Sequence, residues 1–471
     1  MHRFLFSIII LFLSAFELSG QTSSSFSISN TLLISNSKQM PFWFWANTDG
    51  KIETENSGLN ITEIDAGGVH FFNDSNLFIQ AGADLIYGMG NNSRYFQANQ
   101  IFTRINYKSW EFFMGMVQND LFAEGLSTTN GNIARSRNAR PYPKIGVRLS
   151  DYKPVPFLTK FLSFKGEYDE GILYDNRYVD RTHLHHKSLY LKAKFSDNFN
   201  VQGGVEHFVM WGGTSQNEKI GKLPDDCSSY FRYITGSRGD DVFPETDQLN
   251  VAGNQYGTYQ VLLTQKFNSF ELSLNISHPF EDFSGVNLHN WPDNLIGLSI
   301  KFSDDDKIIT HFIYEFTNTR QQSIADSLYY WSDESQKWKS HEYDNYFNHG
   351  VYKSGVTYFQ KTLSSPLSSS LKIVDGTSRG SISTRYFSHH IGLKGKLNRE
   401  IAWKGLLTYI KHLGTWGSPY EIPEEQVSGL LNFSYNQDST PFIIDLTVAG
   451  DIANLQPNRF GIQLGVKYIF E

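Results

Sequence analysis

Basic residues cluster in one segment of the first third of the chain. Arg135, Arg137 and Arg140 lie close together there, and Lys144 and Arg148 follow them. A guanidinium group pairs bidentately with carboxylates, so this cluster is suited to binding acidic sugars. The same groups could instead pair with acids of the protein itself. We take Arg135, Arg137 and Arg140 as candidate glycan contacts and leave that alternative open.

A second basic cluster contains two arginines and three histidines: Arg177, Arg181, His183, His185 and His186. His183 and His185 would share one face of a strand, which suggests a metal site. No cysteine or acid stands at a supporting spacing, so hydrogen bonding of the histidines is the preferred interpretation. We expect no metal and no cofactor, and we add Arg177 and Arg181 to the candidate glycan contacts.

Several tryptophans fall in or beside expected loops: Trp211, Trp291, Trp331, Trp338 and Trp416. Aromatic faces stack on sugar rings, but tryptophans also anchor membrane proteins at the lipid–water interface. The interfacial role is favoured for the group, and Trp211 is retained as a candidate glycan contact.

Two patterns could indicate hydrolysis. Glu167 and Asp169 share a strand face, and a glycosidase needs two acids roughly 5–10 Å apart. Residues 376–380 match the nucleophile elbow, but that motif needs a strand–turn–helix, and here it lies in a long polar loop. Neither pattern is convincing, so we expect no catalytic residues and no enzymatic activity.

Composition narrows the class of protein. The chain has 471 residues, of which 40% are hydrophobic and 15% are aromatic, and no Pro/Ser-rich linker divides it. After the N-terminal region no apolar run reaches the roughly 20 residues that a transmembrane helix needs. The net charge of −7 gives no sign of a nucleic-acid partner. With Cys227 as its one cysteine, the chain can form no internal disulfide.

The first residues have the features of a signal peptide. Arg3 provides a basic start, Phe4–Phe16 is an apolar stretch too short to span a bilayer, and Ser19-Gly20 are small. We therefore expect a signal peptide at 1–20 and a single exported unit at 21–471.

Strict alternation of apolar and polar residues predicts β-strands. It is clearest at the C-terminus, where one face contains Phe460, Ile462, Leu464, Val466, Tyr468 and Phe470 and the other contains Gly461, Gln463, Gly465 and Lys467. An apolar face against lipid and a polar face against a wet lumen are typical of an outer-membrane β-barrel. The terminal strand also resembles the assembly signal of such barrels, although Glu471 follows the final aromatic residue.

Short and long connections alternate between the expected strands. Short turns occur, among others, at Asn73–Ser75, 108–109, 197–198, 268–269 and 398–399, and long connections at 118–143, 170–187, 212–256, 318–382 and 411–426. This asymmetry is typical of barrels with tight periplasmic turns and long outer loops.

The strand count predicts a further strand near the N-terminus. About seventeen strands follow residue 64, and bacterial barrels have an even number, so ~18 are expected. Phe26–Ile34 is the first candidate for the additional strand, and Leu59–Ile64 the second. The block Pro41–Trp45 is apolar on both faces, which predicts a buried plug within an N-terminal strand and plug region at 21–63.

Several stretches resemble the Wzi family of capsule-assembly outer-membrane proteins. They are Met40–Asn47 (MPFWFWAN) followed by Asp49-Gly50, Asn138–Pro143 (NARPYP), Leu184–Tyr190 (LHHKSLY), and Gly204–His207 with Met210–Gly213. The resemblance implies an 18-stranded barrel occluded by internal helices and loops. It implies a non-enzymatic protein that binds capsular or related surface polysaccharide.

The sequence therefore predicts an all-β fold, an antiparallel transmembrane outer-membrane β-barrel of about 18 strands with an N-terminal plug and long extracellular loops. The expected partners are capsular polysaccharide or exopolysaccharide, and outer-membrane lipid and lipopolysaccharide, whose phosphates are a further alternative partner for the arginines. We expect a monomer in the cell outer membrane and no nucleic-acid partner. The alternative function is a porin or substrate channel.

Overall fold

A computed structural model describes residues 20–72, 76–324, 329–332, 337–340, 343–437 and 439–470. The expected signal peptide lies outside these residues except for Gly20, as does the predicted turn Asn73–Ser75.

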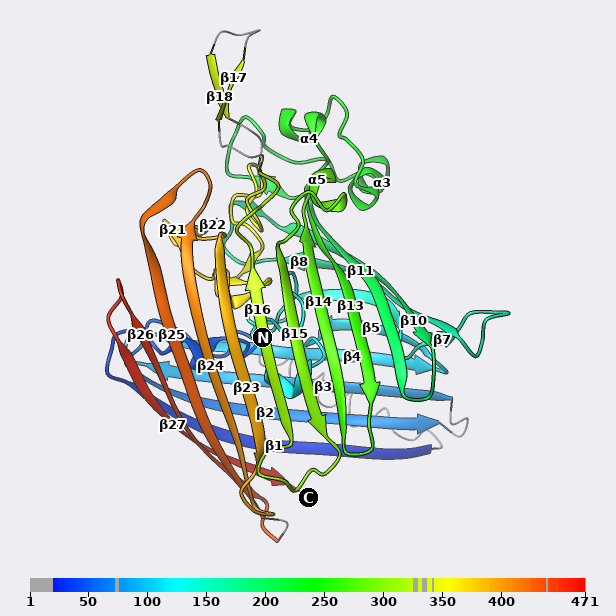
Figure 1. The fold of residues 1–471 in the computed structure, drawn as a ribbon, viewed down its shortest axis with the longest axis vertical. Coiled ribbons are helices and arrows are strands. Elements are labelled where there is room, and N and C mark those ends of the chain that lie inside the picture. Colours follow the sequence, from blue (N-terminus) through cyan, green and yellow to red (C-terminus); the bar gives the residue numbers. More distant parts are fainter. Residues whose placement is uncertain are drawn as a thin grey trace, which may run out of the picture.

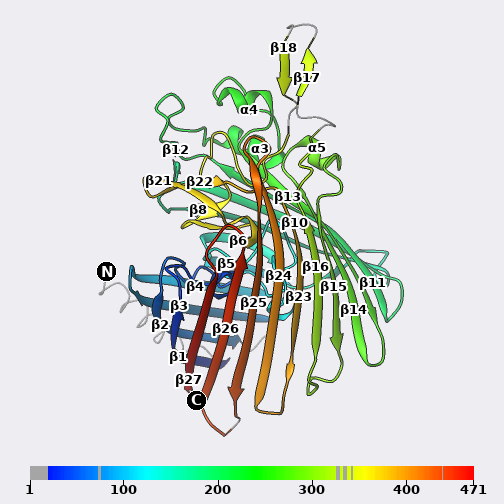
Figure 2. The ribbon, with the colours of Figure 1, turned by 60° about the vertical axis from the view of Figure 1, so that its left-hand side comes forward.

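The strands form one closed antiparallel sheet in which neighbours follow chain order and the last strand pairs with the first (Figures 1 and 2). The sheet contains 19 strands, of which β7 (Lys153–Pro154) is a two-residue segment beside β8, so 18 strands make the wall. The predicted strand number is confirmed. The wall strands are β1 (Gly20–Ser35), β2 (Gly58–Phe72), β3 (Leu77–Gly90), β4 (Arg94–Tyr107), β5 (Trp110–Met116), β6 (Pro143–Leu149), β8 (Leu162–Leu173), β10 (Thr182–Lys194), β11 (Phe199–Trp211), β13 (Asn254–Lys266), β14 (Phe270–Phe280), β15 (Asn294–Phe302), β16 (His311–Asn318), β23 (Tyr386–Lys396), β24 (Ile401–Gly414), β25 (Pro419–Asn436), β26 (Phe442–Ala453) and β27 (Arg459–Phe470).

The additional N-terminal strand is β1, which contains the predicted Phe26–Ile34 and pairs with both β2 and β27. Leu59–Ile64, the second candidate, is part of β2. Without β1 the wall could not close, because an unpaired strand edge in lipid would leave backbone N–H and C=O groups without partners.

The two faces of the wall differ as the alternation predicts. On β27, Phe460, Ile462 and Leu464 are 51%, 57% and 49% exposed, whereas Gly461 and Gly465 on the opposite face are buried. Apolar side chains can remain exposed on the outer face because lipid covers them there.

The connections separate the two ends of the barrel. One end has short turns such as 108–109, 195–198, 267–269 and 397–400, and the other has the long connections 117–142, 212–253 and 319–385. The helices α3 (Cys227–Thr235), α4 (Glu245–Leu249) and α5 (Phe283–Val286) lie at this long-loop end, opposite the C-terminus (Figure 1). No helix among the described residues is long and apolar enough to cross a membrane.

Several short elements lie in the connections between the wall strands. They are the strands β9 (Val179–Asp180), β12 (Thr214–Ser215), β17 (Tyr329–Ser332), β18 (Lys337–Ser340), β19 (Thr357–Tyr358), β20 (Lys361–Thr362), β21 (Leu371–Val374) and β22 (Thr377–Ser381), the α-helix α2 (Phe42–Trp45), and the 3-10 turns Ala123–Gly125 and Pro366–Ser368.

Two of the predicted long connections are wrong in extent. The connection predicted at 170–187 is only 174–181, and the one predicted at 411–426 is only 415–418. In both places the strands continue beyond the apolar band with polar residues on their outer faces, such as Glu170 and the ion pair Lys411–Glu425. Such segments lose the alternation that identifies a strand in lipid.

The aromatic block Pro41–Trp45 rests against the inner face of the wall. Pro41 precedes the helix α2, where its missing N–H costs nothing, and Phe42, Trp43 and Phe44 are buried. The Phe42 N–H donates to Asp451 Oδ2 on β26 at 2.9 Å. The Phe44 ring lies over Gly461, so close that a Cβ at Gly461 would stand 2.6 Å from Phe44 Cε2.

Gly461→Val should therefore destabilise the barrel, because its added carbons overlap Phe44. Overpacking of this kind costs about 1–3 kcal/mol. Gly203→Val is the matched control, since nothing lies within 4 Å of a Cβ at Gly203. We expect a lower thermal unfolding midpoint for Gly461→Val only, measured by heat-modifiable gel mobility of the folded protein. Equal midpoints would contradict the packing of Phe44 on Gly461.

Candidate functional site

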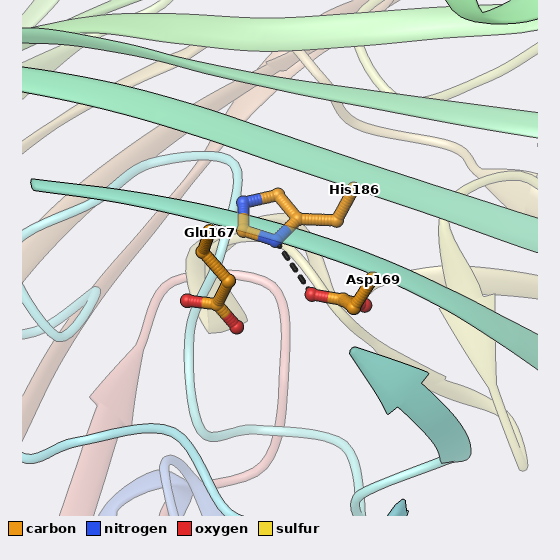
Figure 3. A group of neighbouring side chains, drawn as sticks. All are labelled: Glu167, Asp169 and His186. Atoms are coloured by element: carbon orange, nitrogen blue, oxygen red, sulfur yellow. Dashed lines mark hydrogen bonds and ion pairs between the residues drawn. The ribbon is translucent and has the colours of Figure 1, made fainter. Parts of the chain in front are cut away.

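A cluster of charged side chains lies on the inner face of the wall, where β8, β10 and β11 are neighbours. His186 Nδ1 on β10 is 2.8 Å from Asp169 Oδ2 on β8, and His186 Nε2 is 3.5 Å from Glu206 Oε2 on β11. Glu167 completes the cluster, and Figure 3 shows its carboxyl group converging with Asp169 and His186. The strand register places Asp169 directly opposite His186, so both side chains point inward.

Two cations meet these acids. Arg135 Nη1, on the long connection 117–142, is 3.7 Å from Glu167 Oε2 and 3.5 Å from Glu206 Oε2. Lys144 Nζ, on β6, is 3.5 Å from Asp169 Oδ2 and 3.7 Å from Glu167 Oε1. Buried charges are costly unless they are paired, so the acids of the wall hold Arg135, and with it the connection 117–142, inside the barrel.

Glu167, Asp169 and His186 have the geometry of a possible metal site, since their ligand atoms all lie within 4.8 Å of one another. Asp169 Oδ1 and His186 Nε2 have no hydrogen-bond partner among the described residues. However, Arg135 and Lys144 already supply two positive charges to this group, which removes the electrostatic need for a metal ion. We therefore interpret the cluster as a charge-compensated anchor.

Arg137 joins two inner segments. Its Nε donates to Asp49 Oδ1 at 3.0 Å, its Nη2 pairs with Asp49 Oδ2, and Nη2 also donates to Gln118 Oε1 at 3.1 Å. Burial raises the pKa of Asp49 above its usual range, and the guanidinium of Arg137 opposes that shift. The cation thus offsets part of the cost of burying this carboxylate.

Arg140 and Arg177 contact the long connection 319–385. The Arg140 guanidinium lies 3.0 Å from the centre of the Phe359 ring, and burial lowers its pKa. Arg177 Nη1 is 3.1 Å from Asp175 Oδ1 and donates to the carbonyl oxygen of Thr357 at 3.1 Å. Both arginines hold loops together.

The remaining two candidates lie elsewhere. Arg181 is exposed beside the start of β10, with a φ of 51°. Trp211 is buried on the outer face of β11, where it stacks on His183 at 4.5 Å and its Nε1 donates to Glu170 Oε2 at 3.3 Å. The six predicted glycan contacts therefore do not converge on one site.

A polar cavity of about 450 Å³ opens at the long-loop end. Its lining includes Trp45, Lys361, Tyr420, Arg459 and Asn138, the acids Glu55 and Glu424, and the exposed Gln456. Lys361 is buried, and burial lowers its pKa; its ammonium lies 5.5 Å from the centre of the Trp45 ring. In the described part of the chain Lys361 has no carboxylate partner within ion-pair distance. No sequence signal identified this lysine, because it lies in a long polar loop.

A second cavity of about 340 Å³ lies toward the short-turn end and is lined by Arg135, Arg148, Tyr190 and Gln202, among others. No described residue lines both cavities. The connection 117–142 contributes Asn138 to the first cavity and Arg135 to the second, so it lies between them.

Comparison with known proteins supports the fold. No family model and no curated protein matches the chain. Among solved structures, the chain is similar to Wzi of Escherichia coli, with a TM-score of 0.59, 13% identity, and coverage of 99% of this chain and 87% of that one. The fold is that of an outer-membrane β-barrel. Wzi is described as a carbohydrate-binding β-barrel involved in group 1 capsule assembly.

Two Pseudomonas aeruginosa barrels also match. OpdQ has a TM-score of 0.48 at 8% identity, with 96% of this chain and 99% of that one covered. OprD has a TM-score of 0.49 at 10% identity, with 96% and 97% covered.

Arg135→Gln should destabilise the protein, because it leaves Glu167 and Glu206 without their shared cation. Breaking a buried ion pair costs roughly 3–5 kcal/mol. The control Lys194→Gln removes a lysine whose pair with Asp197 is solvent-exposed, and such pairs contribute at most about 1 kcal/mol. Denaturant unfolding in detergent should show a lower midpoint for Arg135→Gln alone. The anchor role would be contradicted if both variants unfolded at the wild-type midpoint.

Proposed function

We propose that this protein is a non-enzymatic outer-membrane barrel that binds or organises capsular or related surface polysaccharide at the cell surface. Three observations support the proposal: the motif segments that resemble the Wzi family, a fold similar to Wzi, and the polar cavity at the long-loop end. The cavity has the volume of an ordinary small-ligand site, sufficient for a short stretch of a glycan chain.

The observation that carries the proposal is the contact between the first two motif segments, Met40–Gly50 and Asn138–Pro143. Arg137, just before Asn138–Pro143, pairs with Asp49, just after Met40–Asn47. Gly50 has a φ of 67°, and a Cβ there would stand 2.8 Å from the backbone nitrogen of Arg140. Residues in or beside both motifs thus bring two inner segments together. Trp45 and Asn138 from these segments line the polar cavity at the long-loop end.

We also propose that these inner segments occlude the lumen. The helix α2, the connection 117–142 and the strand β16 share one buried apolar cluster that includes Trp43, Leu126 and Ile313. Glu315 on β16 fixes the connection further, since its carboxylate accepts from the Thr128 N–H at 2.8 Å and from Ser127 Oγ at 2.5 Å. A barrel blocked in this way is suited to holding a polymer at its outer face.

We propose that Lys361 and Arg459 attract acidic sugars to their part of the cavity, although Glu55 and Glu424 also line it. Arg459 Nη1 is 3.5 Å from Asp451 Oδ2, so part of its charge is already compensated. Lys361 lacks such a partner among the described residues and is therefore the cation that a uronate or another acidic substituent would approach. Tyr420 and Trp45 offer aromatic surface beside it.

Lys361→Gln should weaken binding of an acidic surface polysaccharide at least about tenfold, because hydrogen bonds to charged groups contribute about 1.5–3 kcal/mol. Lys372→Gln is the matched control, since Lys372 is exposed in the same connection and does not line the cavity. Purified full-length variants would be titrated with polysaccharide isolated from the host, using calorimetry.

The proposal would be contradicted if the wild-type protein bound no host polysaccharide and deletion of its gene left polysaccharide retention on cells unchanged. Binding that is equally weakened in both lysine variants would remove the assignment to this cavity.

A further inference from the structure

On the outer surface of β16, β23 and β24, the side chains change from apolar to aromatic and then to basic toward the long-loop end. The change occurs at a similar height on all three strands. On β23 the outward residues run from Ile391 through His389 and Phe387 to Arg385 just before the strand. The neighbouring faces follow the same order: Phe312, Tyr314, Phe316, Asn318 and then Arg320 on β16, and Leu407, Tyr409 and Lys411 on β24. An aromatic layer between apolar and polar residues is typical of the membrane–water interface. Arg320 and Arg385 therefore stand at the height of lipid headgroups.

These two arginines are held next to each other. Arg385 Nε donates to the backbone carbonyl oxygen of Arg320 at 3.3 Å. The Arg385 guanidinium lies 3.5 Å from the centre of the Trp416 ring, and that of Arg320 lies 4.9 Å from the centre of the Phe387 ring. Stacking on aromatic rings fixes the planes of both groups. Arg320 Nε donates to Asn318 Oδ1 at 2.5 Å, and the Nη groups of both arginines make no hydrogen bond among the described residues.

Among the described residues, no acid forms an ion pair with either arginine. The acid that acts on Arg385 is Asp293, whose carboxylate is occupied by the backbone N–H groups of Gln321 and Gln322 at 3.0 and 2.7 Å and by the side chain of Asn318 at 2.9 Å. Lys411 on the same face pairs with Glu425 at 2.8 Å. Two like charges near each other repel, and an anion bound between the two guanidinium groups would relieve that repulsion.

We propose that Arg320 and Arg385 form a binding site for the phosphate group of an outer-leaflet lipid. A phosphate monoester carries more than one charge and several acceptor oxygens, so it can bridge two guanidinium groups bidentately. The acyl chains would then lie along the apolar outer faces of β16, β23 and β24, below Tyr314 and Tyr409. The site is on the outside of the wall. It does not depend on polysaccharide binding in the polar cavity at the long-loop end.

The test uses delipidated full-length protein and native mass spectrometry to count bound lipid. The probes are phosphorylated lipid A, the same lipid A after enzymatic removal of its phosphate, and inorganic phosphate alone. We expect the phosphorylated lipid to bind about tenfold more tightly than the dephosphorylated one, since each basic residue at such a surface contributes several-fold. The double variant Arg320→Gln/Arg385→Gln should lose that preference.

The control variant Lys194→Gln/Lys266→Gln removes the same charge from exposed residues at the short-turn end and should keep the preference. If the double arginine variant does not fold, the single Arg320→Gln variant decides, because Arg320 is exposed and its loss should still reduce the preference several-fold. Equal binding of the two lipids by the wild type, an equal loss in the control variant, or complete displacement of the lipid by inorganic phosphate would each overturn the proposal.

Discussion

The arrangement inside the barrel depends on the buried ion pairs of Arg135. This guanidinium ties the connection 117–142 to Glu167 and Glu206 on the wall, and removing it would leave these two buried acids without the cation that they share. Glu315 and His390 add contacts on the opposite side, where His390 Nε2 lies 2.6 Å from the carbonyl oxygen of Leu126. The connection is therefore tied to the wall by charge and by hydrogen bonds.

The other inner features follow from this tie. Once the connection 117–142 is fixed, Arg137 can reach Asp49, and the segment that contains α2 is held against β26 and Gly461. The polar cavity at the long-loop end is what remains between these segments and the loop that contains Lys361. Arg135 and Arg137, which suggest glycan binding when read from the sequence, make ion pairs that hold the segments around the cavity.

The wall could be predicted from the sequence because lipid and lumen impose a strict period of two on each strand. This rule located the C-terminal strand and required the additional strand β1. It failed above the apolar band, where Glu170 and Lys411 face outward and strands continue without the alternation.

The candidate site could be predicted only in part. The sequence indicated that Arg135 and Arg137 could bind carboxylates, but it could not distinguish carboxylates of a sugar from those of the protein itself. Glu206 and Asp49 are distant from these arginines in sequence and become their partners only through the closed barrel. Lys361 was missed because its significance lies in burial without a carboxylate partner among the described residues.

The central claim, that the inner segments close the lumen, is tested most directly by single-channel recording of the full-length protein in planar bilayers. We predict no stable open conductance, and a large, stable single-channel conductance would contradict this account.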